Sequence, residues 1–130
     1  MKPILLLLFS FLSLNSSYSQ EKKAPEYVTY YFVELIPNTE KTDFTAEELR
    51  EIQTKHLRNI RKMVSDGLLL LAGPFPETGG GLFILKTKSI DEAENLVMID
   101  PAVKAGRFKY EIKTWITQKG LLALEDGIND

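Results

Sequence analysis

Four stretches of the chain concentrate apolar residues as β-strands do. Residues 27–35 place aromatic or branched side chains at odd and even positions alike, so both faces of this predicted strand are apolar. Residues 68–72 are apolar throughout, which predicts a central strand, and we expect them to pair as a hairpin with the apolar run 81–86. Residues 107–117 alternate apolar with mostly charged side chains, which predicts a last, partly exposed strand.

The first of two predicted helices begins at a capping-box pattern, in which Thr45 and Glu48 can satisfy free backbone amides. The helix runs to about Asp66, and Gly67 suits the left-handed position after a helix end. At 100° per residue, one narrow stripe holds most of its apolar residues and has the sole histidine of the chain at its centre. The stripe, which we expect to face the sheet, is Leu49, Ile52, His56, Ile60 and Met63.

The second predicted helix begins at another capping box, Ser89–Glu92, and ends at the Asp100-Pro101 pair. The elements therefore follow the order β-α-β-β-α-β, which is the ferredoxin-like arrangement of the α+β class. In this arrangement the two helices cover only one face of the sheet, yet the first and third strands are apolar on both faces. Because an uncovered apolar face is unusual in a monomer, we expect a homodimer that packs sheet against sheet.

The N-terminus has the pattern of a secretory signal peptide. Lys2 supplies the positive charge, residues 4–14 supply the apolar core, and Ser17 and Ser19 around Tyr18 predict cleavage before Gln20. The core is too short to span a bilayer as a stable anchor, so we expect no stable membrane insertion after cleavage; an uncleaved anchor is the alternative. We therefore expect an exported protein, periplasmic or extracellular. The chain divides into a signal peptide at 1–19, a leader at 20–26, the folded domain at 27–117, and a tail at 118–130 that contains a helical turn at 121–125.

Composition and charge exclude several classes of function. Without residues 1–19, 111 residues remain with 15 basic and 18 acidic side chains, and such a mildly acidic chain is a poor match to nucleic acid. The sequence has no cysteine and one histidine, which argues against thiol chemistry and against a zinc site. No helix follows Gly79-Gly80-Gly81, so this run predicts a hairpin loop rather than a phosphate-binding loop. We expect no metal and no cofactor.

Two residues are candidates for chemistry. His56 is either a core histidine with one satisfied hydrogen bond, the simpler interpretation from the sequence alone, or a proton-transfer group. Asp100 has two interpretations. It is either a residue that only ends the helix, as Asp-Pro pairs commonly do, or a carboxylate stabilised by some other contact. The second interpretation arises because a helix C-terminus disfavours negative charge. A carboxylate beside His56 would orient the imidazole and favour its protonated form. The sequence does not show whether the two residues meet.

Over residues 27–117 the chain resembles the YCII-related (YciI-like) family. The resemblance rests on short motifs in the correct order: His56-Leu57 with Ile60, Ala72-Gly73-Pro74-Phe75, Gly80-Gly81-Leu82, Glu92-Ala93, Asp100-Pro101-Ala102-Val103, Ala105-Gly106-Arg107-Phe108, and Trp115. It implies a dimeric α+β barrel of ferredoxin-like subunits and an active site built from a histidine and an aspartate, which match His56 and Asp100. Most members have no assigned reaction. One branch removes chloride from a chlorinated hydroxyquinol, and related barrels include muconolactone isomerases.

The residues and the resemblance together predict a cofactor-independent enzyme of the lyase or isomerase type that acts on a small organic substrate. His56 would transfer the proton and Asp100 would hold and polarise the imidazole. The expected pocket lining is Gly73, Pro74, Phe75, Gly81 and Trp115. The signal peptide departs from the many cytoplasmic members, so the resemblance does not identify the substrate of this chain. The alternatives are a non-catalytic small-molecule-binding or structural dimeric module of the cell envelope, and a protein-interaction domain.

Overall fold

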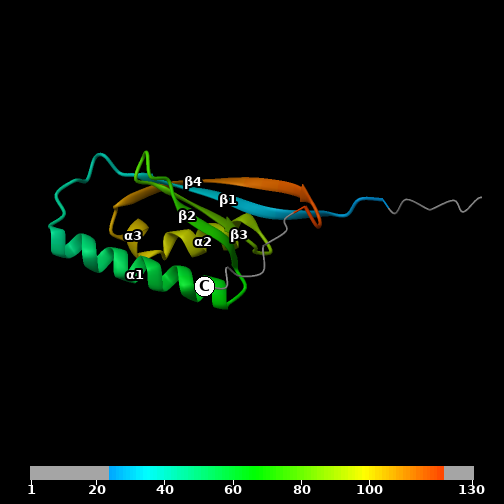
Figure 1. Cartoon of the computed structure of the whole chain (residues 1–130), viewed down its shortest axis with the longest axis horizontal. Helices are drawn as coiled ribbons and strands as arrows, with labels where there is room; N and C mark the ends of the chain where they lie inside the picture. Colours follow the sequence, from blue (N-terminus) through cyan, green and yellow to red (C-terminus); the bar gives the residue numbers. More distant parts are fainter. Residues whose placement is uncertain (1–23, 122–130) are drawn as a thin grey trace, which may run out of the picture.

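A computed structural model describes residues 24–121 as four strands and three helices (Figure 1). In chain order these are β1 (Tyr27–Pro37), α1 (Ala46–Ser65), β2 (Leu69–Pro74), β3 (Gly81–Leu85), α2 (Ile90–Met98), α3 (Pro101–Lys104) and β4 (Phe108–Gln118). The predicted signal peptide, most of the leader and most of the tail, including the helical turn, lie outside the described residues.

The strands form one antiparallel sheet in the order β2-β3-β1-β4, with the helices on one face (Figure 1). The order β-α-β-β-α-β and the ferredoxin-like α+β class are confirmed, with the short α3 added between α2 and β4. The predicted hairpin of β2 and β3 is also confirmed. The prediction of a central β2 is wrong: β2 is an edge strand. An apolar run does not show whether a strand lies at the centre or at the edge of a sheet. In β2, Leu69 reaches the core, but Leu71 is 42% exposed although it is equally apolar.

Helix α1 begins where the capping box predicts. Glu48 N donates to Thr45 Oγ1 at 3.2 Å, and Thr45 N donates to Glu48 Oε2 at 2.7 Å. Gly67 has the left-handed φ of 71° expected after the helix end. Within the apolar stripe His56 and Met63 are buried, whereas Leu49, two turns before His56, is exposed and lies outside the core.

The second capping box forms only in part. Glu92 N donates to Ser89 Oγ at 3.1 Å, but the Glu92 carboxylate accepts from Lys88 N rather than from Ser89 N. Helix α2 ends at Met98 with Ile99 as its C-cap, so it stops directly before the Asp100-Pro101 pair, as predicted. Asp100 is in addition the N-cap of α3, a role the sequence did not indicate, with Pro at the first helical position, where its missing N–H costs no helical hydrogen bond. The N-terminus of α3 thus offsets the unfavourable end of α2 inferred from the sequence, because a helix N-terminus favours a carboxylate.

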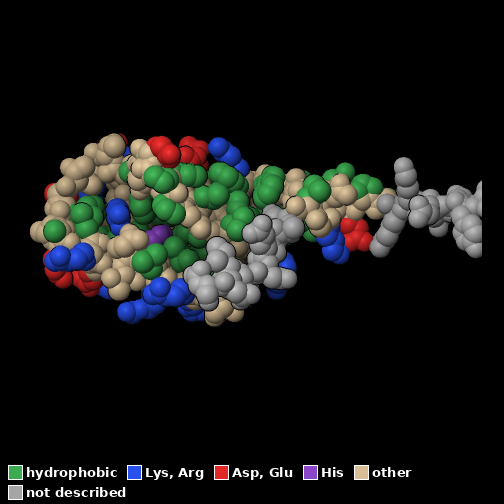
Figure 2. All heavy atoms as spheres, in the orientation of Figure 1, with side chains coloured by type: hydrophobic (Ala, Val, Ile, Leu, Met, Phe, Trp, Pro, Cys, Tyr) green, Lys and Arg blue, Asp and Glu red, His purple; other side chains and the backbone are tan. Residues whose placement is uncertain are grey.

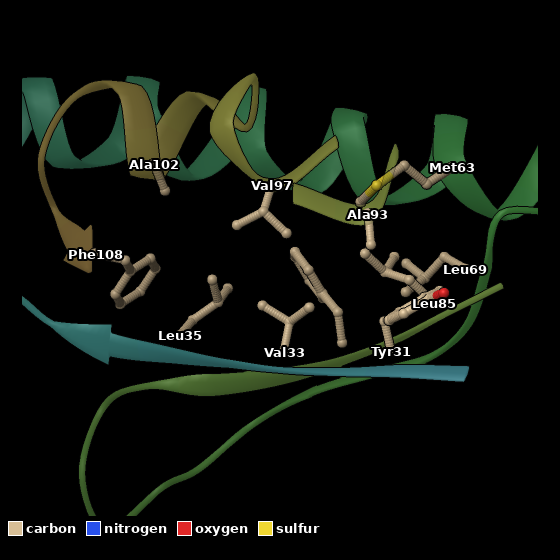
Figure 3. Packing of buried hydrophobic residues seen from close by; sticks show 11 residues of the cluster. Tyr31, Val33, Leu35, Met63, Leu69, Leu85, Ala93, Val97, Ala102 and Phe108 are labelled. Carbon is tan, nitrogen blue, oxygen red and sulfur yellow. The ribbon is translucent and has the colours of Figure 1, made fainter. Parts of the chain in front are cut away.

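The core lies between the sheet and the helices (Figure 3). Every second residue of β1 points into it, namely Tyr31, Val33 and Leu35, and Phe83 and Leu85 of β3 and Val97 of α2 pack against them. No helix of residues 24–121 covers the other face of the sheet (Figure 1). No helix within residues 24–121 is long and apolar enough to cross a membrane.

Strands β1 and β4 continue beyond the rest of the sheet. Strand β3 pairs with β1 only from Tyr31 to Leu35, whereas β4 pairs with β1 from Tyr27 to Pro37. The first four residues of β1 and their partners on β4 therefore form a two-stranded extension of the sheet (Figure 1).

Candidate active site

His56 and Asp100 lie 44 residues apart in the chain and meet inside the domain. His56 Nδ1 is 2.8 Å from Asp100 Oδ1 and 3.0 Å from Asp100 Oδ2. Helix α1 presents the imidazole from its buried face, and the junction between α2 and α3 presents the carboxylate. The packing of α1 on α3 therefore brings together the two residues that the sequence singled out separately.

Asp100 is fully buried, and each of its oxygens accepts hydrogen bonds. Asn59 Nδ2 donates to Oδ2 at 2.8 Å, and Ala102 N donates to Oδ1 at 2.9 Å. Burial alone would raise the pKa of Asp100, but the hydrogen bond and charge of His56, together with Asn59 and Ala102, outweigh it and hold this pKa below its usual value. The carboxylate is therefore ionised at neutral pH.

This arrangement assigns different roles to the two ring nitrogens of His56. Nδ1 faces an ionised carboxylate, so Nδ1 carries a hydrogen and donates it. Nε2 has no hydrogen-bond partner within residues 24–121, and the same residues contain no buried side-chain nitrogen or oxygen without a partner. Nε2 is therefore accessible from outside the core, in position to accept or donate a proton.

Two aromatic rings hold the imidazole. The Phe83 ring stacks on it at a centroid distance of 5.8 Å and an angle of 23°, and the Phe108 ring is tilted against it at 6.0 Å. These contacts, with the Asp100 hydrogen bond, fix the ring orientation before any ligand binds. Figure 2 shows the histidine recessed among hydrophobic side chains.

His56 opens into a pocket of about 490 Å³ between α1, the β2–β3 hairpin and the start of β4. Of the five predicted lining residues, Gly73, Pro74 and Gly81 line this pocket. Phe75 and Trp115 do not line it, which differs from the prediction.

The position of Trp115 follows from strand alternation. Phe108, Tyr110 and Ile112 of β4 pack on the core, so the odd-numbered Trp115 faces the open side of the sheet. There it lines a separate hollow of about 620 Å³ together with Phe32. His56 and Trp115 thus lie on opposite faces of the sheet.

Three polar residues near the site had no role in the sequence-based interpretation. Gln53 and Asn59 lie one turn before and one turn after His56, and this i±3 spacing was the signal that could have identified them. Gln53 and Arg107 both line the pocket, where Arg107 Nη1 donates to Gln53 Oε1 at 2.6 Å. Arg107 lies within a motif quoted for the family resemblance, but nothing local to it indicates a pocket. Within the described part of the chain, no three His, Cys, Asp or Glu side chains group so that they could hold a metal ion.

Comparison with known proteins agrees with this fold. The uncharacterized protein YjpA of Bacillus subtilis (strain 168) is 28% identical over 90 residues, which are 69% of this chain and 99% of YjpA. A solved structure with a similar fold is that of 5-chloro-2-hydroxyhydroquinone dehydrochlorinase (TftG) from Burkholderia phenoliruptrix AC1100, in complex with 2,5-dihydroxybenzoquinone. The two structures superimpose with a TM-score of 0.51 at 19% sequence identity, over 65% of this chain and 92% of the dehydrochlorinase chain. A family model for the YCII-related domain matches residues 30–116, well over half of the sequence. The chain therefore belongs to the YCII-related domain family.

Proposed function

We propose that this protein is a cofactor-independent enzyme of the lyase or isomerase type, acting on a small organic substrate held in the His56 pocket. The observation that carries the proposal is the buried Asp100 carboxylate against Nδ1 of His56, with Nε2 left accessible. A histidine kept only for packing does not require a buried carboxylate fixed by two further donors, because burying a charge is costly unless it is fully hydrogen-bonded.

His56 acts as the proton-transfer group in this mechanism. Nε2 removes a proton from the substrate, and the ionised Asp100 stabilises the imidazolium that forms. In an isomerisation His56 returns the proton to another substrate atom. In an elimination the electron pair released by deprotonation forms a double bond as a leaving group departs as an anion, and His56 passes the proton to water. The dehydrochlorinase that shares the fold carries in its name the loss of hydrogen and chloride, which is an elimination of this type.

The test is turnover by the purified protein of 5-chloro-2-hydroxyhydroquinone and a panel of small lactones, with release of chloride and ultraviolet absorbance as readouts. His56→Gln keeps the size and polarity of the side chain but removes the titrating nitrogen, so kcat/KM should fall about 10²–10⁴-fold. Lys55→Gln, exposed on the same helix, is the matched control and should keep the rate. If His56→Gln leaves turnover, ligand binding and stability unchanged, the proposal fails and a non-catalytic module becomes the better interpretation.

The proposal includes a homodimer formed through the open face of the sheet. Phe32, Leu82 and Ile84 line the hollow on this face, and Trp115 stands beside them with its ring 6.1 Å from that of Tyr30. Apolar side chains on a sheet face without helices favour association with a second such face. The His56 pocket lies on the helix side, so a dimer of this kind leaves it accessible to substrate.

The proposal also includes export to the periplasm or the outside of the cell. The positive residue, short apolar core and small residues around Tyr18 support it. Expression of the whole chain in a bacterium that secretes proteins should yield an extracytoplasmic product whose N-terminal residue is Gln20. Recovery of the chain in the cytoplasm with Met1 retained would contradict export.

A further inference from the structure

The charges around the His56 pocket are unbalanced. His56 and Arg107 are the ionisable residues that line it, and no Asp or Glu does so within residues 24–121. The nearby Asp100 is fully buried behind the imidazole and already accepts hydrogen bonds from His56, Asn59 and Ala102. The pocket therefore presents a guanidinium and an imidazole to a ligand, with no accessible carboxylate opposite them.

Arg107 has few partners of its own. Its Nη1 donates to the neutral Gln53, and its guanidinium carbon lies 5.1 Å from the centroid of the Phe108 ring. No carboxylate of residues 24–121 forms an ion pair with it, whereas several lysines and Arg50 on the surface have such partners. A guanidinium carries five N–H donors, so donors remain for a ligand. A partly buried cation without an anion is unfavourable, and an anionic ligand would compensate for it.

The ring of Phe108 connects the two polar groups. Arg107 lies over this ring, and the imidazole of His56 packs against it at a centroid distance of 6.0 Å. One small molecule can therefore reach both groups. Leu35, Ile60 and Phe83 supply apolar walls for the remainder of the ligand.

From this geometry we infer that the pocket selects small organic anions, such as carboxylates or phenolates with an apolar body, and that Arg107 binds the anionic group. The inference rests on the proposed function and specifies its substrate class. An anion held by Arg107 places the apolar body of the ligand next to Nε2 of His56. The guanidinium also stabilises negative charge that develops on the substrate when His56 removes a proton.

The experiment compares benzoate with benzamide, which share shape and differ in charge, by calorimetric or NMR titration of the purified protein at neutral pH. The wild type should bind benzoate at least about tenfold more tightly than benzamide, because a carboxylate forms a stronger, charge-assisted hydrogen bond with a guanidinium than a neutral amide does. Arg107→Gln should remove this preference, and Arg107→Lys, which keeps the charge, should retain part of it. Arg61→Gln, the same change at an exposed position of α1, is the matched control and should behave as wild type.

Equal binding of the two ligands by the wild type, binding of neither, or an unchanged preference in Arg107→Gln would each overturn the inference. The variant His56→Gln separates the inference from the proposed function. It should lower kcat/KM about 10²–10⁴-fold while keeping the preference for benzoate. Loss of turnover in His56→Gln together with an unchanged preference in Arg107→Gln would leave the enzyme proposal standing and reject the anion site alone.

Discussion

At the scale of single residues, Asp100 serves both the fold and the candidate site. Its Oδ1 caps α3 by accepting from Ala102 N, and the same carboxylate fixes the orientation of His56 and accepts from Asn59. These contacts join α1 to the α2–α3 junction inside the domain. A change at Asp100 should therefore affect stability as well as activity.

We expect Asp100→Asn to lower the free energy of unfolding at pH 7 by about 2–3 kcal/mol. The substitution weakens a charge-assisted hydrogen bond and turns an amide NH₂ toward groups that are themselves donors. Urea unfolding followed by circular dichroism measures the change. Asp43→Asn, at an exposed loop position, is the control and should stay within about 0.5 kcal/mol of wild type. Equal stability of the two variants would contradict this role of Asp100.

The pKa of Asp100 also predicts a pH dependence. Because this pKa is lower in the folded protein than its usual value of 3.8, the stabilisation is present above pH 3.8 and is lost as the pH falls through the lower native pKa. The difference in unfolding free energy between wild type and Asp100→Asn should therefore shrink as the pH falls from about 5 to about 2, by at most about 1.4 kcal/mol per pH unit. Urea titrations at a series of pH values measure it. A difference that stays constant or grows would be inconsistent with a lowered pKa.

At the scale of elements, the loop of the β2–β3 hairpin is held against β1. A Cβ atom at Gly80 would lie 2.3 Å from the carbonyl oxygen of Leu35, and a Cβ at Gly81 would lie 2.9 Å from that of Gly73. These glycines allow the close backbone approach that forms one wall of the His56 pocket. The glycine run thus serves packing, in agreement with its interpretation as a hairpin loop.

We expect Gly80→Ala to destabilise the domain by about 1–3 kcal/mol, because backbone atoms rather than a flexible side chain must move to admit the methyl group. Gly73→Ala is the matched control in the same hairpin, since nothing lies within 4 Å of the Cβ it would add, and it should change stability by less than about 0.5 kcal/mol. Thermal and urea unfolding compare the two. Similar stability of both variants would show that the hairpin loop adjusts freely.

At the scale of the whole molecule, the sheet separates two different surfaces. The helix side holds the core and the His56 pocket, whose candidate residues all come from one chain. The open side carries Trp115 and the apolar hollow. Strands β1 and β4 continue beyond the end of β3. Catalysis and association are thus proposed for opposite faces and can be tested independently.

We expect the purified protein to sediment with twice the mass of its chain and Trp115→Glu to sediment as a monomer. A buried carboxylate without a partner would oppose contact between two apolar sheet faces. Val64→Glu, which adds the same charge at an exposed apolar position of α1, should remain dimeric. Analytical ultracentrifugation measures all three. A monomeric wild type, or a dimeric Trp115→Glu, would reject the open face as the interface.

Local patterns predicted most elements correctly, and the errors share a physical cause. The capping box of α1 and the left-handed Gly67 depend on neighbours within four residues, so the sequence alone contains the information. The edge position of β2 and the N-cap role of Asp100 depend on which segments pack beside them. An apolar run and an Asp-Pro pair are each compatible with two such environments.

The sequence by itself determined the order of the elements and the buried direction of His56, because hydrophobic periodicity and capping act over one or two helical turns. Only the tertiary structure decided that His56 meets Asp100, that Arg107 shares the pocket, and that Trp115 lies on the other face of the sheet. The contact of His56 with Asp100 joins residues 44 positions apart. Such contacts are set by how α1, the α2–α3 junction and β4 pack on the sheet, and no local pattern encodes that packing.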